Sequence, residues 1–493
     1  MKRIVYSFLV ILLALCAVLV VRAARVPAPA EAVSATATVT VDSALAAERL
    51  GAAVRFATVS YATGAPIDTA AFKGFHQFLA ISFPKAHGAL RREFINGLSL
   101  LYTWPGIDTT AAPVVLMGHM DVVPVPAPNL PEWTHPPFSG AIADGYVWGR
   151  GTLDDKTTVL ATLEAVEGLV AAGYRPPRTV YLAFGHDEEV GGRYGARAIV
   201  AELVRRGVKP ALVIDEGGLL VNGVIPGIAG QAAIIGIAEK GYLSLYLRAK
   251  AQGGHSSMPT GRTAIGALSR AIAALEAHPF PLSLDGPTRG MIDAMAPYSS
   301  FPGKIALANL WLTEPIVKRM MSSTPLGAAL LRTTISPTML NAGIKDNVLP
   351  PEATAVVNFR IRPGESVASV TQYVRDVIAD SMIVVEPTDS ARAEPSPVSD
   401  ITSPAYQLIA STIRGMTPGV SLPVLPYLVM GGTDAKYWSD HSDRVFRFLA
   451  VPVGQSDVAR VHGVNERIAV KDYAVAVGFF SRLLRGLDAL GAR

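Results

Sequence analysis

The sequence contains a single cysteine, Cys16, which lies in an apolar run near the N-terminus. One cysteine cannot form a disulfide within the chain, and a cysteine-rich zinc site is excluded for the same reason. Any metal ion must therefore be held by histidine, aspartate and glutamate. Charged residues are also scarce, at 17% of the chain, and no long low-complexity tract is present, which argues against a disordered protein.

An excess of charge of one sign is also missing. The formal net charge is only +4, and the basic residues are scattered, so the sequence does not indicate a nucleic-acid-binding protein. It also lacks a phosphate-binding loop of the Walker type, which counts against a phosphoesterase on an α/β sheet. Half of the 493 residues are hydrophobic, and a chain of this length predicts two domains with a large buried core.

Residues 1–25 form a separate N-terminal unit, followed by a Pro/Ala-rich linker at 26–41. Basic residues flank an apolar run at 4–21, which is just long enough to span the hydrocarbon core of a bilayer. Arg22 interrupts the only small-residue site that resembles a signal cleavage site. We therefore predict an uncleaved membrane anchor, with a cleaved secretory signal as the alternative. In either case we expect the bulk of the chain outside the cytoplasm, in the periplasm or the extracellular space.

Strand and helix patterns alternate in the next part of the chain. Apolar runs that predict buried strands occur at 98–104, 113–121, 179–188 and 210–218, and helical patterns occur at 157–173 and 193–207. This alternation predicts an α/β fold with a mostly parallel sheet covered on both faces. In such sheets the functional groups gather at the carboxyl ends of the strands.

The pattern changes near residue 237. Two alternating strands, at 240–254 and 353–364, are each followed by a helix, at 263–278 and 366–381. We therefore predict an inserted α+β domain at 237–392 that divides a catalytic domain into two parts, at 42–236 and 393–493. Apolar stretches inside the insertion suit either a hydrophobic substrate pocket or the core of the inserted domain. These stretches are 291–301, 308–312 and 317–321.

Five clusters of acidic residues and histidine lie at predicted strand ends or in loops. They are His119 with Asp121, Asp154 with Asp155, Glu188 with Glu189, Asp215 with Glu216, and His462. Alone, each cluster also suits a cap, a turn or a structural histidine. However, charges placed directly after buried strands are costly unless they are paired or bind metal, and three strands in succession end this way. Together the clusters predict a metal site.

The residue types indicate which metal this site binds. Imidazole mixed with carboxylate, without thiolate, suits zinc, with cobalt or manganese as substitutes. Two histidines and three carboxylates are too many for one tetrahedral zinc with an open position, but they suit two zinc ions that share a bridging carboxylate. One glutamate then remains as a general base for hydrolysis. Asp121 shares a strand face with His119 and can accept a proton from its far ring nitrogen.

Several motifs occur in the order typical of a known family. They include TWPG at 103–106, GHMDVVPV at 118–125, GYVWGRGTLDDK at 145–156, HDEEVGG at 186–192, DEGG at 215–218, GGHSSMP at 253–259, NVLP at 347–350 and HGVNE at 462–466. Through them the chain resembles the di-zinc peptidases that include carboxypeptidase S, aminoacylase and succinyl-diaminopimelate desuccinylase. The match is strongest to the carboxypeptidase S branch and its secreted N-acyl amino acid hydrolase relatives. It covers nearly the whole chain after the N-terminal unit.

The resemblance implies a role for each clustered residue. His119 binds the first zinc, Asp154 bridges both zincs, Asp121 orients His119, Glu188 is the general base, and Glu189 and His462 complete the second zinc site. The first zinc takes its last ligand from the DEGG motif, where Asp215 and Glu216 both stay open. The resemblance also implies a cis peptide bond between Asp154 and Asp155.

In the inserted domain, the resemblance implies a lid that also forms a homodimer. His255 would stabilise the oxyanion, in its own or in a partner subunit. Asn347 and Arg360 would hold the carboxylate of the substrate, a task that suits the planar fork of arginine. Lys436 stands where some relatives carry arginine, so the resemblance is weaker at that point.

The implied reaction is hydrolysis of an amide or peptide bond next to a free carboxylate, which releases a C-terminal amino acid from short peptides. Cleavage or synthesis of N-acyl amino acids is an alternative with the same chemistry. An inactive, membrane-anchored binding protein is an alternative of another class, but all the expected ligands and the base are present. The expected partners are therefore one of these substrates, a membrane and a second copy of the chain, and no nucleic acid.

Overall fold

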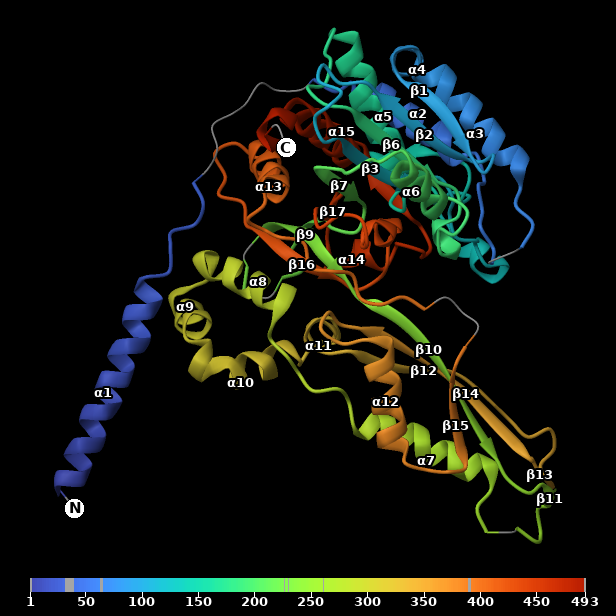
Figure 1. Ribbon diagram of the computed structural model, residues 1–493, viewed down its shortest axis with the longest axis vertical. Coiled ribbons are helices and arrows are strands. Elements are labelled where there is room, and N and C mark those ends of the chain that lie inside the picture. The colour runs from blue at the N-terminus through green and yellow to red at the C-terminus, as the bar shows by residue number, and fades with distance from the viewer. Residues whose placement is uncertain are drawn as a thin grey trace.

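The structure is a computed structural model that describes residues 2–31, 40–62, 65–225, 227–228, 230–259, 261–388 and 392–491. Residues 32–39 of the predicted linker and residues 260 and 389–391 of the predicted insertion lie outside the described residues. Figure 1 shows an upper lobe around a large sheet, a lower lobe around a small sheet, and an N-terminal helix at the left that points away from the upper lobe.

The large sheet has ten strands, in the order β1-β2-β6-β3-β7-β17-β9-β8-β18, with β16 paired to β9. These strands are β1 (Arg91–Ile95), β2 (Ser99–Trp104), β3 (Val114–His119), β6 (Val180–Gly185), β7 (Leu212–Asp215), β8 (Leu220–Asn222), β9 (Gln231–Glu239), β16 (Val424–Val429), β17 (Val445–Arg447) and β18 (Pro452–Val453). The central strands β6, β3, β7 and β17 run parallel, whereas β1 and β2 form an antiparallel edge. The predicted α/β fold with a mostly parallel sheet is thus confirmed.

Strand β3 shows why the central runs of the sequence are apolar without alternation. Val114 and Leu116 pack into the core on one face of the sheet, and Val115 and Met117 pack into a separate core on the other face. Helices cover both faces, so neither set of side chains can be polar. The first face is covered by α2 (Ser43–Val54), α3 (Thr69–Ser82), α4 (Pro84–Ala89), α5 (Lys156–Ala171), α13 (Pro404–Met416) and α15 (Val470–Arg485), and the second by α6 (Ala196–Arg205) and the 3-10 helix η4 (Asp434–Trp438).

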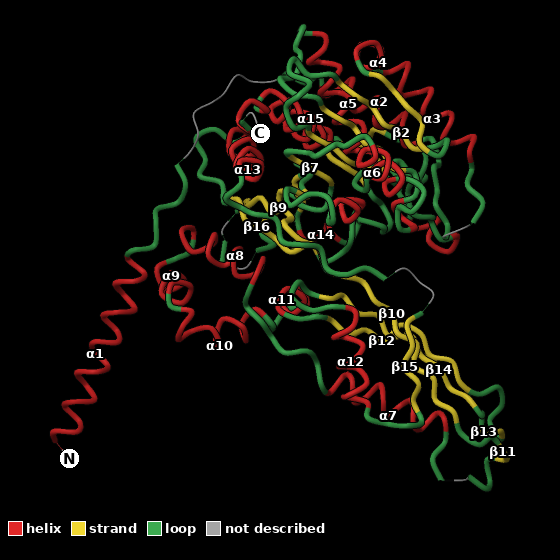
Figure 2. Tube along the Cα trace, viewed as in Figure 1, coloured by secondary structure: helices red, strands yellow, loops and turns green. Residues whose placement is uncertain are grey.

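The lower lobe contains a small antiparallel sheet of four strands, in the order β12-β14-β10-β15. Its strands are β10 (Gly241–Lys250), β12 (Thr334–Ala342), β14 (Glu352–Ile361) and β15 (Ile383–Pro387), and its helices are α7 (Ala264–Ala277) and α12 (Val367–Ile378). Both helices lie on one face, where Leu243, Leu245 and Leu247 form the core with them (Figure 2). Residues 244 and 246 alternate with these leucines and point to the open face.

Helices α8 (Gly286–Met295), α9 (Phe301–Ala308), α10 (Leu310–Met321) and α11 (Pro325–Leu331) lie below the upper lobe in Figure 1, with α9 and α10 on the side of α1. Their buried residues, including Met291, Leu310 and Val317, belong to the core of the large sheet and not to that of the small sheet. The apolar stretches of the insertion therefore do not build the core of the small sheet.

Short elements complete the described part of the chain. A three-stranded sheet contains β4 (Ile142–Ala143), β5 (Tyr146–Trp148) and β19 (Arg467–Ala469), and a two-stranded sheet contains β11 (Gly254–His255) and β13 (Val348–Leu349). The short helices are α14 (Gln455–Val458) and the 3-10 helices η1 (Ala127–Glu132), η2 (Glu188–Val190), η3 (Ala296–Tyr298) and η5 (Leu487–Leu490). Helix α1 (Lys2–Ala24) is the one described helix that is long and apolar enough to cross a membrane, a property that a signal sequence shares.

Candidate metal centre

The carboxyl ends of β3, β6 and β7 meet at one edge of the large sheet, because these three strands are parallel neighbours. His119 is the last residue of β3, Glu188 and Glu189 follow β6, and Asp215 ends β7. The loop before α5 adds Asp154, whose peptide bond to Asp155 is cis. The order of the strands therefore gathers side chains that are far apart in the sequence.

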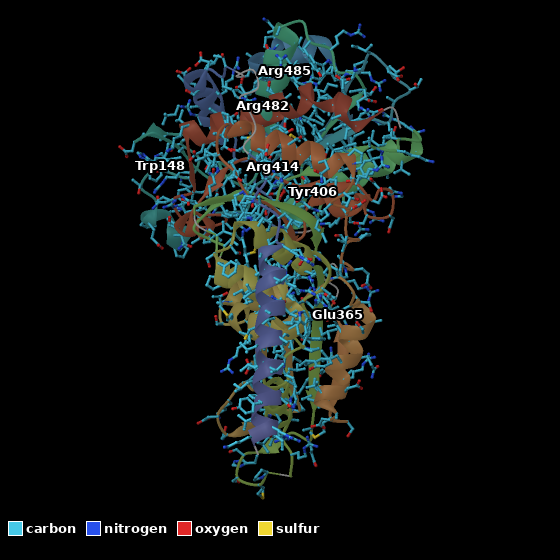
Figure 3. The ribbon with its side chains drawn as sticks, turned by 90° about the vertical axis from the view of Figure 1, so that its left-hand side faces the viewer. Trp148, Glu365, Tyr406, Arg414, Arg482 and Arg485 are labelled. Carbon is cyan, nitrogen blue, oxygen red and sulfur yellow. The ribbon has the colours of Figure 1, made fainter. Side chains whose placement is uncertain are left out.

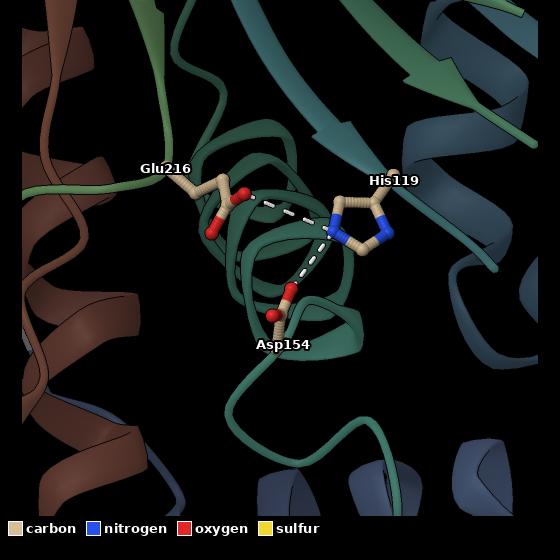
Figure 4. Close-up of side chains that lie close together, drawn as sticks. All are labelled: His119, Asp154 and Glu216. Carbon is tan, nitrogen blue, oxygen red and sulfur yellow. Dashed lines mark hydrogen bonds and ion pairs between the residues drawn. The ribbon is translucent and has the colours of Figure 1, made fainter. Parts of the chain in front are cut away.

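One group of possible metal ligands consists of His119, Asp154 and Glu216 (Figure 4). His119 Nε2 lies 2.9 Å from Asp154 Oδ1 and 3.9 Å from Glu216 Oε1. His119 is 1% exposed. Burial, together with the nearby negative charges of Asp154 and Asp155, raises the pKa of Glu216 well above its ordinary value.

The other ring nitrogen of His119 points away from this group. His119 Nδ1 lies 3.0 Å from the backbone carbonyl oxygen of Asp121 and 3.5 Å from its Oδ1. The Asp121 carboxylate also accepts hydrogen bonds from the backbone N–H groups of Glu188 and Glu189, both at 3.1 Å. Asp121 therefore contacts the ring nitrogen of His119 that points away from the group, and it also holds the backbone that carries the two glutamates.

A second group shares Asp154 with the first and adds Glu189 and His462. His462 Nε2 lies 3.0 Å from Asp154 Oδ2 and 3.2 Å from Glu189 Oε2. Hydrogen bonds to Asp154 and Glu189 raise the pKa of His462 to about 10. Burial favours the neutral form of Asp154, but its hydrogen bonds to the two histidines outweigh burial and lower its pKa below the ordinary value.

Asp215 and Glu216, which the sequence leaves open, differ in their contacts. Asp215 accepts hydrogen bonds from the backbone N–H groups of Glu216, at 3.0 Å, and Ala435, at 2.7 Å. It is 3% exposed, and both of its oxygens are used in this way. Glu216 is the member of the pair that faces His119.

Glu188 stands beside both groups without belonging to either. Burial raises the pKa of its carboxyl well above the ordinary value, and the negative charges of Asp434 and Glu189 act in the same direction. A carboxylate whose pKa is raised toward the pH of the reaction is suited to accept a proton and to return it.

The residues present fit a metal site on the chemistry of their donors. Each group combines imidazole nitrogen with carboxylate oxygen, and zinc binds such atoms at roughly 2.0–2.2 Å. Ligand atoms of one ion therefore lie about 3–4 Å apart, which the contacts of His119 and His462 match. In addition, Glu189 Oε1 is buried without a hydrogen-bond partner in the described structure.

Glu466, which sequence reasoning missed, supports the loop that carries Asp154. It is 0% exposed, and its Oε1 accepts hydrogen bonds from the backbone N–H groups of Gly151, Leu153 and Asp154 at 3.0, 2.8 and 3.3 Å. Its Oε2 receives a 2.5 Å ion pair from Arg150, whose Nη2 donates to the His462 carbonyl oxygen at 3.0 Å. The signal was available, because Glu466 ends the HGVNE motif.

Asp434 was missed as well. It is 2% exposed and neither carboxylate oxygen has a hydrogen-bond partner among the described residues. Burial raises its pKa well above the ordinary value, although the positive charge of Lys436 acts against this shift. The GGTDAKYW loop thus brings a buried carboxyl and a lysine close to Glu188.

The three predicted residues of the insertion are not brought to the cluster within one chain. His255 and Asn347 lie together at the far tip of the lower lobe, where Ser256 N–H donates to the Asn347 carbonyl oxygen at 3.1 Å. Both side chains are exposed. Arg360 lies on β14, over the ring of Tyr242 at 4.8 Å, and lines a groove of about 720 Å³ on the open face of the small sheet.

Comparisons with known proteins show which family the chain resembles in sequence. The profile of peptidase family M20/M25/M40 matches residues 115–486. A probable carboxypeptidase S-like protein 2 of Dictyostelium discoideum is 41% identical over 446 residues, which cover 90% of this chain and 85% of that protein. The N-fatty-acyl-amino acid synthase/hydrolase PM20D1 of Mus musculus is 38% identical over 444 residues, covering 90% of this chain and 87% of that protein.

Solved structures show the same fold at lower sequence identity. The M20 family metallo-carboxypeptidase Sso-CP2 of Sulfolobus solfataricus has a TM-score of 0.65 at 18% identity, covering 89% of this chain and 98% of that chain. Human carnosine dipeptidase 1 has a TM-score of 0.62 at 17% identity, covering 90% of this chain and 96% of that one.

Proposed function

The chain belongs to peptidase family M20/M25/M40, and on that premise we propose how its side-chain cluster works. The chain is a metallopeptidase-type hydrolase, and its sequence places it among carboxypeptidase S-like relatives. Its reaction is the hydrolysis of an amide or peptide bond next to a free carboxylate. The observation that supports this most directly is the pair of ligand groups that share Asp154 beside an unused glutamate.

We propose that the cluster holds two zinc ions, for which cobalt or manganese can substitute. His119, Asp154 and Glu216 hold the first, and Asp154, Glu189 and His462 hold the second. Glu216 is preferred over Asp215 because both Asp215 oxygens already accept backbone hydrogen bonds. When bound, the two ions supply Lewis acid chemistry, which lowers the pKa of a water molecule to about 7 and polarises the scissile carbonyl group.

Glu188 is the proposed general base. It removes a proton from the attacking water and then passes that proton to the nitrogen of the leaving amine. The leaving group is a free amino acid. Asp121 keeps His119 in one orientation and fixes the backbone of Glu188, so that the base and the ligand keep their relative positions.

The proposed base is tested by Glu188→Gln, which keeps the shape of the side chain and removes its basicity. We expect amino acid release from a blocked Gly-Leu dipeptide to fall by about 10²–10⁴-fold, because general base catalysis contributes that much. Zinc content, measured by mass spectrometry of the purified chain, should stay at two ions. Full turnover with zinc retained would disprove the role of Glu188, and loss of zinc would assign it to the ligands.

Two classes of substrate are candidates for this reaction. Release of a C-terminal amino acid from short peptides is the first. Cleavage or synthesis of N-acyl amino acids is the second, and it is favoured by the PM20D1 protein of Xenopus tropicalis, named as an N-fatty-acyl-amino acid synthase/hydrolase, which aligns with 98% of this chain at 37% identity. Comparing kcat/KM for a blocked Gly-Leu dipeptide and for N-acyl-phenylalanine decides between them.

We also propose that the small sheet forms a homodimer and that His255 serves the partner subunit. Within one chain His255 lies at the tip of the lower lobe, away from the cluster, where it would stabilise the oxyanion only after a second subunit approaches. In this proposal Asn347 and Arg360 hold the substrate carboxylate.

Complementation between subunits tests this arrangement. Glu188→Gln and His255→Ala chains are each expected to be inactive. When they are dissociated, mixed and reassociated, a mixed dimer contains one site with both an intact Glu188 and an intact His255 from the partner. We therefore expect activity to return on mixing. If His255 acted within its own chain, the mixed dimer would stay as inactive as its parents.

The N-terminal helix is proposed to anchor the chain in a membrane, with the catalytic lobe outside the cytoplasm. This rests on the length and apolar character of α1 and on the basic residues at both of its ends. A cleaved signal is the alternative, which N-terminal sequencing of the mature chain distinguishes.

A further inference from the structure

Helices α9 and α10 carry few buried side chains. Helix α9 has none that is fully buried, and in α10 only Leu310 and Val317 are. By contrast, α8 buries five residues, of which Met291, Ile292 and Met295 belong to the core of the large sheet. The two helices are therefore held on one side only.

The outer side of α10 is apolar. Trp311 is 58% exposed, Leu312 43%, Ile316 60% and Met320 69%, and Phe301 at the start of α9 is 50% exposed. Leu312, Ile316 and Met320 follow one another at intervals of four residues, so they share one face of the helix. We call these five residues the α10 patch. The outer face of a surface helix is normally polar, so the α10 patch needs a partner.

The neighbouring helix α1 indicates what this partner is. Leu15, Leu19 and Ala23 of α1 are the side chains that are shielded, at intervals of four residues, whereas most of the helix is exposed. Asn309 Nδ2 donates to the Leu19 carbonyl oxygen at 3.1 Å, and Arg22 Nε donates to the Ala308 carbonyl oxygen at 3.2 Å. Figures 1 and 3 show α1 beside these helices from two directions.

These contacts set the depth of α9 and α10 relative to a membrane. The 23 residues of α1 extend over about 34 Å, close to the roughly 30 Å of a hydrocarbon core. The two residues whose hydrogen bonds join α1 to the α9–α10 junction, Leu19 and Arg22, belong to the last third of this span. If α1 crosses a bilayer, the α9–α10 junction must therefore lie at the boundary between lipid and water on that side.

The charge around the patch matches such a boundary. Lys304, Lys318 and Arg319 lie on α9 and α10, whereas Glu314 is the one acidic residue of the two helices and pairs with Lys318 at 2.5 Å. Basic side chains near an apolar helix face bind anionic headgroups, and tryptophan is enriched at this depth.

We propose that the α10 patch inserts into the headgroup region of the bilayer that α1 crosses, and that the basic residues beside it contact anionic lipid. The proposal rests on the proposed anchoring by α1, but not on the proposed reaction. It means that the chain is held at the membrane at two points, so that the catalytic lobe keeps one orientation and does not swing on the linker.

Trp311 provides a native probe. The other four tryptophans, Trp104, Trp133, Trp148 and Trp438, are at most 8% exposed, so Trp311 is the one that contacts solvent or lipid. The full chain is reconstituted in phosphatidylcholine vesicles containing phosphatidylglycerol, with a nitroxide quencher on the upper part of the lipid chains. We expect the lipid nitroxide to quench the tryptophan fluorescence of the chain strongly and acrylamide to quench it weakly. In Trp311→Phe the quenching by the lipid nitroxide should disappear.

A matched control places tryptophan at an exposed apolar position of the upper lobe. Ile81 is 70% exposed and belongs to α3, a helix that lies on the opposite side of the molecule from α1 in Figure 1. In Trp311→Phe with Ile81→Trp, acrylamide should quench the new tryptophan and the lipid nitroxide should not. Ile316→Asn with Met320→Asn should reduce lipid quenching of Trp311, while flotation and amino acid release stay unchanged.

Three results would overturn the proposal. If Trp311 in the floated chain is quenched by acrylamide as strongly as in the Ile81→Trp control, the patch is in water. If neither quencher reaches Trp311, a protein surface, such as a second copy of the chain, covers it. If the chain does not float with the vesicles, both the anchor and the patch proposal fail, while zinc-dependent amino acid release, measured in the same sample, reports separately on the proposed reaction.

Discussion

At the scale of single residues, Glu466 shows how a group outside the proposed metal ligands can hold two of those ligands in place. Its carboxylate holds the backbone of the Asp154 loop, and its partner Arg150 holds the backbone carbonyl of His462. Loss of a partner that orients a metal ligand typically reduces metal affinity by about 10–100-fold. These contacts end on Asp154, the proposed bridging ligand, and on His462, a proposed ligand of the second zinc, so binding of the second zinc should be affected most.

We therefore expect Glu466→Gln to weaken binding of the second zinc by about 10–100-fold and to lower kcat more than it raises KM. The measurement is competition for zinc with a chelating dye, together with the visible spectrum of the cobalt-substituted chain, which reports ligand geometry. Glu164→Gln is the matched control, since Glu164 also pairs with an arginine, Arg49, at 2.7 Å. An unchanged cobalt spectrum and zinc affinity would show that Glu466 only stabilises the fold.

The pair Asp215 and Glu216 marks what residue types could not settle in advance. Both are carboxylates, they stand next to each other at the end of β7, and zinc accepts either. What separates them is direction, because adjacent residues at a strand end point to opposite sides. Asp215 turns toward the backbone of the Ala435 loop and Glu216 toward His119. That difference depends on a loop some 220 residues away in the sequence, which no local pattern contains.

At the scale of elements, Gly140 allows α2 to lie close to the segment that leads to β4, β5 and the Asp154 loop, and Gly145 provides a comparison. Gly140 has a φ of +58°, and a Cβ placed on it would lie 1.9 Å from the Gly51 carbonyl oxygen of α2. Gly145, in the turn between β4 and β5, has a φ of +79° but open space around it. The two positions therefore separate backbone conformation from a steric clash.

Gly145→Ala should lower the free energy of unfolding by about 1–2 kcal/mol, the cost of a left-handed conformation for a residue with a Cβ. Gly140→Ala adds a clash with backbone atoms, and we expect a loss of at least about 3 kcal/mol. Urea unfolding of both variants, followed by circular dichroism, gives the comparison. Equal losses would mean that α2 moves away easily and does not fix this segment.

Elements were predicted best where one physical cause sets the pattern. The strands β2, β3, β6 and β7 follow from continuous apolar runs, because helices cover both faces of the sheet. The same apolar signal left two alternatives open in the insertion, where 291–301 and 308–312 suited either a substrate pocket or the core of the inserted domain. Apolar composition indicates that a segment packs against another element, but it does not indicate which element. Here the elements are the large sheet and α1.

At the scale of the whole molecule, the charge of the metal centre links metal binding to stability. Four carboxylates of this centre lie close together, and burial raises the pKa of Glu188, Glu189 and Glu216. Without metal, the folded chain therefore retains protons that the unfolded chain has released above a pH of about 4.5. The stabilisation from these protons is present at low pH and is lost as the pH rises through the raised values.

His462 acts in the same direction. Its pKa is raised from 6.5 to about 10, so its contribution to the metal-free fold is complete below the lower value and disappears as the pH rises through the upper one. Half of the side chain is exposed, so solvent screening reduces the size of this effect. Bound metal reverses the trend, because it takes the place of these protons and its affinity increases as they leave.

We therefore expect a chelator to lower the unfolding temperature more at about pH 9 than at about pH 6, because the metal-free chain loses stability over this range and the metal-bound chain does not. At a free zinc concentration 100 times Kd, bound metal contributes about 2.7 kcal/mol per site. Differential scanning fluorimetry of the full chain, with chelator and after zinc is restored, measures the difference. His462→Ala should reduce the pH dependence in chelator, since it removes one of the groups that titrates. A chelator effect of the same size at both pH values would mean that protons do not occupy the metal ligands in the metal-free chain, and the proposed ligand set would then have to change.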